Sequence, residues 1–171
     1  MRGVEVASGR GLELGAAAPD FELPVLRSGI KSRLRLSDQL RAHCVVLAFY
    51  PTNWENASAQ QMRDYQAALD TLRTDRAEVI AICVDSIMNT TVWEREIGPF
   101  DFAICSDFWP HGEVSRSYGV MRTEGVHRGR SERAVFVIGR SGTVLFRKLY
   151  RDAEVPSIAD FLEVLTECAK R

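Results

Sequence analysis

The chain has 171 residues, of which 46% are hydrophobic and 26% charged, proportions that are ordinary for a globular domain. With 22 basic and 23 acidic side chains its formal charge is −1, so no overall field favours nucleic acid or a membrane surface as a partner. The first residues lack the apolar stretch of a signal peptide, and no later run reaches membrane-spanning length, so a cytoplasmic location is expected.

Residues 1–13 are polar and are expected to form a flexible N-terminus ahead of a single domain over residues 14–171. The segment PDFELPVLRSGIKSRLRL predicts a β-hairpin that turns at Ser28 and Gly29. The continuous apolar run CVVLAFY, residues 44–50, predicts a strand that is covered on both faces.

An amphipathic helix is predicted next, because apolar residues recur at spacings of three and four. These residues are Met62, Tyr65, Leu69 and Leu72. Ser58 and Gln61 match a capping box, which predicts that Ser58 is the N-cap of this helix.

The remaining segments predict two more buried strands, EVIAICV and DFAIC, with the helix NTTVWEREI between them. The loop SDFWPHG, a helical turn, the hairpin RAVFVIGRSGTVLFRKLY and a final helix capped by Ser157 follow. This order predicts an α/β fold with a mixed central sheet flanked by helices. Sites in such sheets form at the carboxyl ends of the parallel strands, which indicates the turn after Tyr50 and the loop after Cys105.

The four cysteines, Cys44, Cys83, Cys105 and Cys168, include no CxxC pair and no zinc-knuckle spacing. In a reducing cytosol they are expected to be free thiols, mostly buried. No metal site is predicted.

Five phrases of the chain occur in the same order in peroxiredoxins of the alkyl hydroperoxide reductase/thiol-specific antioxidant group. They are LGAAAPDFEL, VVLAFYPTNW, AICVDS, SDFWPHGEVSRSYGV and RAVFVIGRSG. The chain therefore resembles this family over nearly its whole length, and the fourth phrase is most similar to the one-cysteine alkyl hydroperoxide reductase E type. The resemblance implies a thioredoxin-like fold with an N-terminal β-hairpin, and it implies no cofactor.

The family pattern has a Pro, then a Thr, then the peroxidatic Cys, with an Arg far downstream. Laid on this chain, the resemblance places Pro51 and Arg133 at the Pro and the Arg, Glu55 at the Thr position and Ser58 at the Cys position. The thiolate is the nucleophile of this chemistry, and a hydroxyl cannot pass through the sulfenic acid and disulfide states. The resemblance therefore implies that the usual peroxidase cycle does not run through Ser58.

Two other sources of a nucleophile are open. Ser58 could act in acyl chemistry if Glu55 or His111 served as its base, although a helix-capping role already explains this serine. Cys105, at a strand end, could replace the missing thiol, although a buried structural cysteine is the simpler interpretation.

Several residues around this loop are candidate pocket or interface residues. Tyr50 and Trp54 flank the loop after the central strand and are expected at the pocket or its rim, with Cys105 and His111. Arg133 is interpreted either as an anion-recognising side chain or as part of a solvated loop, and Arg122, Arg128 and Arg130 as solvated. The aromatic loop of Phe108, Trp109 and Pro110 predicts a homodimer interface.

The leading hypothesis is a peroxiredoxin-fold protein that has lost thiol peroxidase activity and keeps a pocket for a small-molecule ligand or for chemistry without a thiol. One alternative is an active thiol-dependent peroxidase, if Ser58 is an engineered replacement of Cys or if Cys105 substitutes. The other is an enzyme recruited to a non-redox reaction through Glu55, Ser58 and Arg133.

Overall fold

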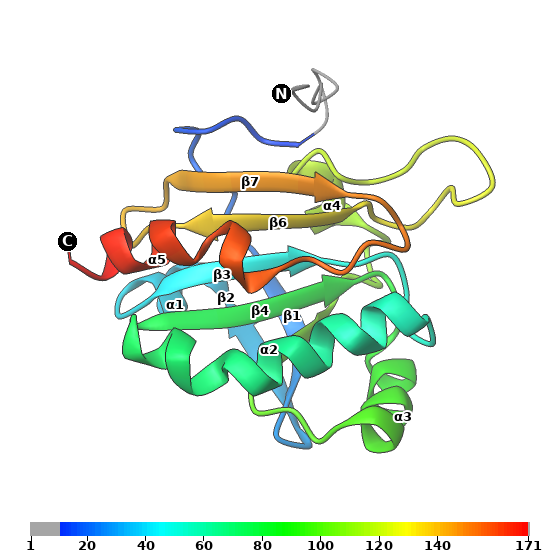
Figure 1. Cartoon of the computed structure of the whole chain (residues 1–171). Helices are drawn as coiled ribbons and strands as arrows, with labels where there is room; N and C mark the ends of the chain where they lie inside the picture. Colours follow the sequence, from blue (N-terminus) through cyan, green and yellow to red (C-terminus); the bar gives the residue numbers. More distant parts are fainter. Residues whose placement is uncertain (1–10, 171) are drawn as a thin grey trace.

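The apolar run at residues 44–50 forms an interior strand, β3, of a seven-stranded sheet (Figure 1). The computed structural model describes residues 11–170, and all six residues of β3 (Cys44–Phe49) are buried. β3 pairs in parallel with β4 (Ala77–Cys83) and antiparallel with β6 (Arg133–Ile138). Because ladders flank it on both sides and helices cover both faces, this strand has no polar residue.

The strand order is β2-β1-β5-β4-β3-β6-β7. The outer strands are β1 (Glu22–Arg27), β2 (Ile30–Arg35), β5 (Ala103–Ser106) and β7 (Val144–Tyr150). Both predicted hairpins are confirmed, since β1 pairs antiparallel with β2 and β6 with β7. The first turns where Ser28 and Gly29 take φ values of 49° and 74°, the left-handed region that hairpin turns require.

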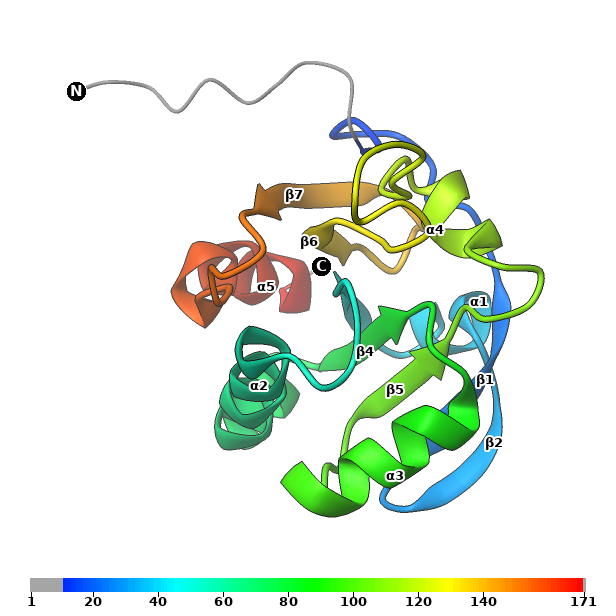
Figure 2. The same cartoon turned by 90° about the vertical axis from the view of Figure 1, so that its right-hand side faces the viewer.

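The helices cover the sheet on two sides, with α2 and α5 on one face and α1 and α4 on the other (Figure 2). They are α1 (Leu36–Leu40), α2 (Asn56–Thr74), α3 (Ile87–Ile97), α4 (Glu113–Ser117) and α5 (Leu162–Ala169), with a 3-10 turn η1 (Ile158–Asp160) before the last. Each face has its own apolar core, one containing Tyr65 and Trp93 and the other Phe49 and Phe136. None of the helices in the described part is both long and apolar enough to cross a bilayer.

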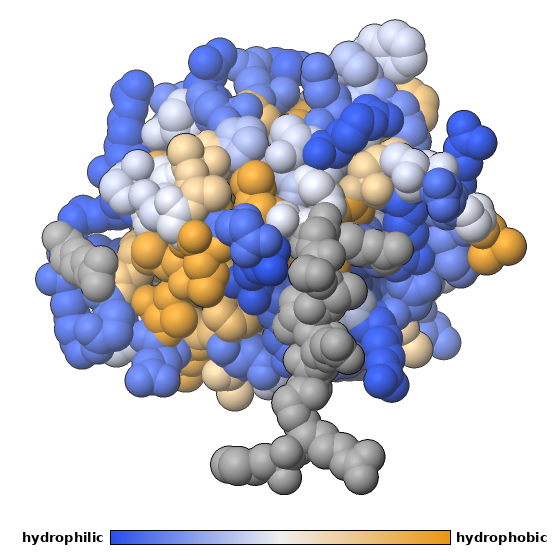
Figure 3. Space-filling model, turned by 90° about the horizontal axis from the view of Figure 1, so that it is seen from above, coloured by the Kyte–Doolittle hydropathy of each residue, from blue (hydrophilic) through white to orange (hydrophobic). Residues whose placement is uncertain are grey.

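The edge strand β7 is less covered than the centre, because its five interior residues are only partly buried. From above, the molecule presents a mostly hydrophilic surface with an apolar area toward one side (Figure 3). Residues 1–10 of the predicted flexible N-terminus lie outside the described residues. Gly11 and Leu12, which belong to the same prediction, donate backbone hydrogen bonds to the carbonyl oxygens of Gly119 and Tyr118.

Two local predictions were wrong at helix starts. α2 begins at Asn56 with Glu55 in the N-cap position, so Ser58 is the third residue of the helix and not its cap. The predicted final helix is divided, because the chain forms η1 at Ile158 before α5 begins; Ser157 caps η1 by accepting a hydrogen bond from the backbone N–H of Ala159.

The prediction of four free thiols was wrong for two of them. Cys44 and Cys168 form a disulfide, with Cα atoms 6.5 Å apart and a sequence separation of 124 positions. The bond forms because α5 packs over the sheet and brings its last turn to the start of β3. Cys83 and Cys105 are free and buried, as predicted.

Replacing Cys168 with Ser is expected to lower the free energy of unfolding by roughly 2–5 kcal/mol, because the cross-link restricts the unfolded chain over a long loop. Urea denaturation without reductant measures the difference. Repeating both titrations with reductant is the control, since the wild-type protein then loses the same bond. If the two proteins differed in free energy of unfolding by the same amount with and without reductant, the disulfide would not be the cause of the difference.

Candidate active site around Ser58 and Arg133

The turn after β3 is held by the side chain of Asp85. Asp85 Oδ2 accepts hydrogen bonds from Thr52 Oγ1 at 3.0 Å and from the backbone N–H of Asn53 at 2.7 Å. Trp54 follows with φ of +63°, and its indole N–H donates to Asn89 Oδ1 at 3.0 Å. These contacts fix the direction in which the chain enters α2 and so place the first turn of that helix.

Ser58 lies in this first turn and is fully buried. Its hydroxyl donates to Glu55 Oε2 at 3.1 Å and accepts from both terminal nitrogens of Arg133 at 3.3 Å. The spacing of three residues puts Glu55 and Ser58 on the same side of the helix, as predicted. The serine oxygen therefore lies between a carboxylate and a guanidinium.

Arg133 opens β6 and has no exposed surface, so the solvated-loop interpretation was wrong for this residue. Besides Ser58, its guanidinium donates to Gln61 Oε1 at 2.7 Å and to Glu55 Oε2 at 2.9 Å. Nε and Nη2 also donate to the main-chain oxygen of Asp152 at 3.1 and 2.9 Å. Burial lowers the pKa of Arg133 from its usual value, and the Glu55 carboxylate opposes that shift.

Two members of this cluster were not predicted as site residues. Gln61 was expected to cap the helix, but its side chain holds Arg133. Asp152 lies in the connection after β7 and contributes a main-chain oxygen, which every residue type possesses, so the sequence carries no signal for it.

Three other candidate residues, Tyr50, His111 and Cys105, make their contacts with residues other than Ser58. The side chain of Tyr50 is buried and donates to Asn53 Oδ1, so it belongs to the core and not to a pocket rim. His111 Nε2 lies 2.7 Å from the carbonyl oxygen of Gly129, and no contact with Ser58 is observed among the described residues. Cys105 is buried in the core on the other face of the sheet, and burial raises the pKa of its thiol.

The predicted interface loop is exposed. Phe108 and Trp109 retain 52% and 79% of their surface, although both are large aromatic residues. Trp54, in the turn between β3 and α2, is 52% exposed. The structure thus leaves aromatic surface exposed in both loops.

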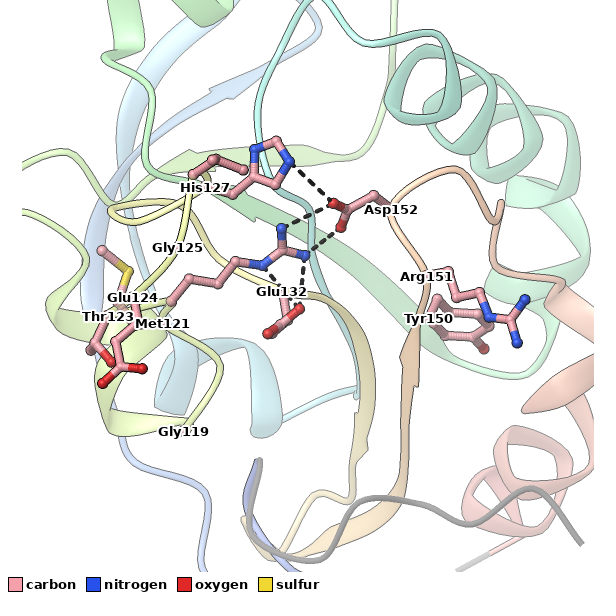
Figure 4. Close-up of a pocket in the computed structure, with 12 residues that line it drawn as sticks. Gly119, Met121, Thr123, Glu124, Gly125, His127, Glu132, Tyr150, Arg151 and Asp152 are labelled. Atoms are coloured by element: carbon pink, nitrogen blue, oxygen red, sulfur yellow. Dashed lines mark hydrogen bonds and ion pairs between the residues drawn. The ribbon is translucent and has the colours of Figure 1, made fainter.

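A cavity of about 690 Å³ adjoins this cluster through Asp152 (Figure 4). Among its lining residues, Arg122 Nε and Nη2 donate to Glu132 Oε2 at 3.0 and 2.7 Å, and Arg122 pairs with both carboxylate oxygens of Asp152. The expectation that Arg122 is solvated was therefore wrong, since only 13% of its side chain is exposed. Asp152 faces Arg122 with its carboxylate and Arg133 with its carbonyl, so one residue connects the cavity to Ser58.

Comparisons with known proteins agree on one family. The AhpC/TSA family profile matches residues 14–147, about four-fifths of the chain. The chain belongs to the AhpC/TSA family of peroxiredoxins. Alkyl hydroperoxide reductase E of Mycobacterium bovis is 32% identical over 144 residues, which is 84% of this chain and 90% of that protein. The chloroplastic 2-cysteine peroxiredoxin of Chattonella marina is 27% identical over 139 residues, 78% of this chain and 68% of that protein.

Solved structures of peroxiredoxins share the fold. The reduced 2-Cys peroxiredoxin of Plasmodium vivax has a TM-score of 0.81 at 21% identity, covering 89% of this chain and 79% of that one. The AhpC of Mycobacterium tuberculosis has a TM-score of 0.79 at 17% identity, covering 90% and 91%. Together with the seven-stranded mixed sheet, this likeness confirms the predicted thioredoxin-like α/β fold of this peroxiredoxin.

Replacing Asp152 with Asn tests the link between cavity and cluster. The hydrogen bond from Arg122 holds the pKa of Asp152 below its usual range, so the folded state binds this proton less readily than the unfolded chain. The stabilisation is therefore full above the ordinary aspartate pKa of about 3.9 and is lost as pH falls through the lower folded value. Urea titrations from pH 7 to pH 3 should show a gap between wild type and Asp152→Asn that narrows on acidification. A gap that stays constant over this range would contradict the assignment.

Proposed function

We propose that this protein is a peroxiredoxin-family member without thiol peroxidase chemistry, because Ser58 stands where the family pattern has its peroxidatic cysteine. The observation that carries the proposal is the position of Ser58 Oγ between Glu55 and Arg133 in the first turn of α2. A thiol in this position would be drawn toward its thiolate by the guanidinium and the helix N-terminus. A hydroxyl stays protonated there and has no sulfenic acid state.

No other cysteine supports a displaced peroxidase site. Cys105 and Cys83 are both fully buried, and burial raises the pKa of the Cys83 thiol to about 12. Cys44 and Cys168 are bonded to each other. Because peroxide reduction needs a thiolate, the raised thiol pKa values and the disulfide favour the loss of the activity over its transfer to another cysteine.

The contacts of Ser58 also argue against a recruited acyl-transfer enzyme. A nucleophilic serine needs a base that is free to take its proton. Glu55 accepts a hydrogen bond from the Ser58 hydroxyl but is ion-paired with Arg133 at 2.9 Å, and His111 is hydrogen-bonded to Gly129. We therefore favour binding of a small molecule over catalysis, with the cavity at Arg122 and Asp152 as the space for a ligand because Ser58 Oγ is already hydrogen-bonded to Glu55 and Arg133.

Replacing Ser58 with Cys is the decisive experiment. The wild-type protein is expected to consume no peroxide, whereas Ser58→Cys is expected to react stoichiometrically, because Glu55, Gln61 and Arg133 are already arranged around that atom. Peroxide loss and sulfenic acid trapping by mass spectrometry measure the reaction.

The matched control is Ser58→Cys with Arg133→Lys, which keeps the positive charge but removes the fork of donors; it should react at least about tenfold more slowly. Rapid peroxide-dependent loss of free thiol in the wild-type protein, followed by turnover with a dithiol, would refute the proposal. A Ser58→Cys protein that folds but does not react would show that the site no longer fits peroxide.

We also infer that the loop with Phe108 and Trp109 forms a homodimer, since its exposed aromatic surface is of the kind found at the centre of interfaces. Trp109→Ala is expected to weaken dimerisation at least about tenfold. Sedimentation velocity over a concentration series measures the effect, with Ile30→Ala as the control, because Ile30 is 70% exposed at the tip of the first hairpin. A wild-type protein that stays monomeric at high micromolar concentration would contradict the inference.

A further inference from the structure

The disulfide lies at the end of the sheet opposite the Ser58 loop. Cys44 is the first residue of β3, and Cys168 is the penultimate residue of α5. Figure 1 shows the end of α5 and the starts of β3 and β4 together on the left, whereas the connection from β3 to α2 lies on the right. The paired sulfur atoms are therefore separated from Ser58 by the length of β3.

A second cavity, of about 430 Å³, lies next to this disulfide. Its lining is formed by Ala42, His43, Arg73, Arg76, Ala77 and Glu78. Cys44 is attached to this lining in three ways. It follows His43 in sequence, its backbone N–H donates to the carbonyl oxygen of Arg76 at 3.1 Å, and it pairs with Ala77 in the β3–β4 ladder.

The charges around this cavity favour an anion. Within residues 11–170, the Arg76 guanidinium has no hydrogen-bond or ion-pair partner, and Arg73 donates only to the carbonyl oxygen of Asp101 at 3.0 Å. Glu78 is the one acidic residue of the lining, and its Oε2 lies 3.6 Å from Arg27 Nη2, which offsets part of its charge. The lining therefore carries a net positive charge, because Arg73 and Arg76 have no acidic partner in the described part of the chain and the carboxylate of Glu78 is partly neutralised by Arg27.

Unpaired polar atoms gather at the same place. Among the described residues, the buried side-chain atoms without a hydrogen-bond partner are Arg27 Nη2, His43 Nδ1 and Glu78 Oε2. His43 and Glu78 line the cavity, and Arg27 is the ion-pair partner of Glu78. Since Arg27 Nη2 and Glu78 Oε2 form an ion pair with each other, His43 Nδ1 is the buried polar atom of the lining without any partner among these residues, and a polar ligand bonded to it would remove the cost of leaving it unpaired.

The two sulfur atoms differ in access. Cys44 is 1% exposed within the sheet, whereas Cys168 is 6% exposed in the last turn of α5, which ends one residue later at Ala169. Terminal helical turns open at low free-energy cost. An attacking thiolate therefore reaches Cys168 first and leaves Cys44 as the departing thiolate, beside Arg76.

We propose that Cys44–Cys168 is an exchangeable disulfide and that the cavity lined by His43, Arg73 and Arg76 binds the anionic group of the small thiol that reduces it. The thiolate forms a bond to Cys168 Sγ, the protein disulfide breaks, and Cys44 leaves as a thiolate. A second thiolate of the same kind attacks the ligand sulfur of this mixed disulfide, which releases Cys168 and yields the ligand disulfide. Two electrons and two protons pass from the two small thiols to the two cysteines.

The proposal goes beyond the function proposed for Ser58 and does not involve that residue. The same exchange run in reverse forms the protein disulfide from a small anionic disulfide, so the protein senses the ratio of the two. The recognition element is the uncovered guanidinium of Arg76, which contrasts with the fully paired guanidinium of Arg133.

The test compares three small thiols on the folded wild-type protein: anionic mercaptoacetate, neutral 2-mercaptoethanol and cationic cysteamine. Each rate is divided by the rate of the same thiolate with a small reference disulfide, and products are followed by thiol titration and by the mass of the mixed disulfide. At low ionic strength, mercaptoacetate is expected to reduce the protein at least about tenfold faster than cysteamine, with a preference that fades as salt is added.

Arg76→Gln is expected to remove the difference among the three normalised rates. Because the guanidinium also lies beside the departing Cys44 thiolate, all three rates are expected to fall in this variant. Arg128→Gln, in the loop before β6, is the matched control and should keep the preference. Reduction that requires global unfolding, equal normalised rates for the three thiols, or a preference that survives in Arg76→Gln would each overturn the proposal. The salt dependence of the wild-type rates tests it without any variant.

Discussion

The buried guanidinium of Arg133 is the interaction on which the Ser58 region depends. A cation without exposed surface must have its donors satisfied within the protein, because an unpaired buried charge is strongly destabilising. Its partners come from α2, through Glu55, Ser58 and Gln61, and from the connection after β7, through the Asp152 carbonyl. This one side chain therefore joins the first turn of a helix, the start of a strand and a loop 19 residues downstream.

The Ser58 hydroxyl stabilises this position although it is unreactive toward peroxide. Ser58 Oγ donates to a carboxylate and accepts from a guanidinium at the same time, so it satisfies polar groups on both sides. Because the neutral hydroxyl is hydrogen-bonded to both Glu55 and Arg133, it stabilises their arrangement even though no thiolate is present. The arrangement of Glu55, Ser58 and Arg133 is thus explained by stability alone, which is why the arrangement by itself does not indicate catalysis.

The parts of the structure that sequence could predict are those encoded by neighbouring residues. The all-apolar run at Cys44–Phe49 predicts the interior strand β3, and the motif phrases indicate the family and the Ser58 loop. The Cys44–Cys168 disulfide was not predicted because its two cysteines are 124 positions apart in sequence and no spacing rule links them. The start of α2 was misplaced because Glu55 takes the N-cap backbone conformation without a side-chain cap. The capping rule therefore selected Ser58, which has the preferred residue type but lies inside the helix.

The difference between Arg133 and Arg76 decides where an anion can be recognised. Both side chains carry the same charge, but Arg133 is surrounded by acceptors from its own chain, whereas Arg76 has none among the described residues. An anion that approached Arg133 would have to displace Glu55 and open the packing around it. An anion that approaches Arg76 replaces only water. Since binding free energy depends on the difference between the bound and free states, the cavity beside the disulfide is the better anion site although the family motif marks the other end of the sheet.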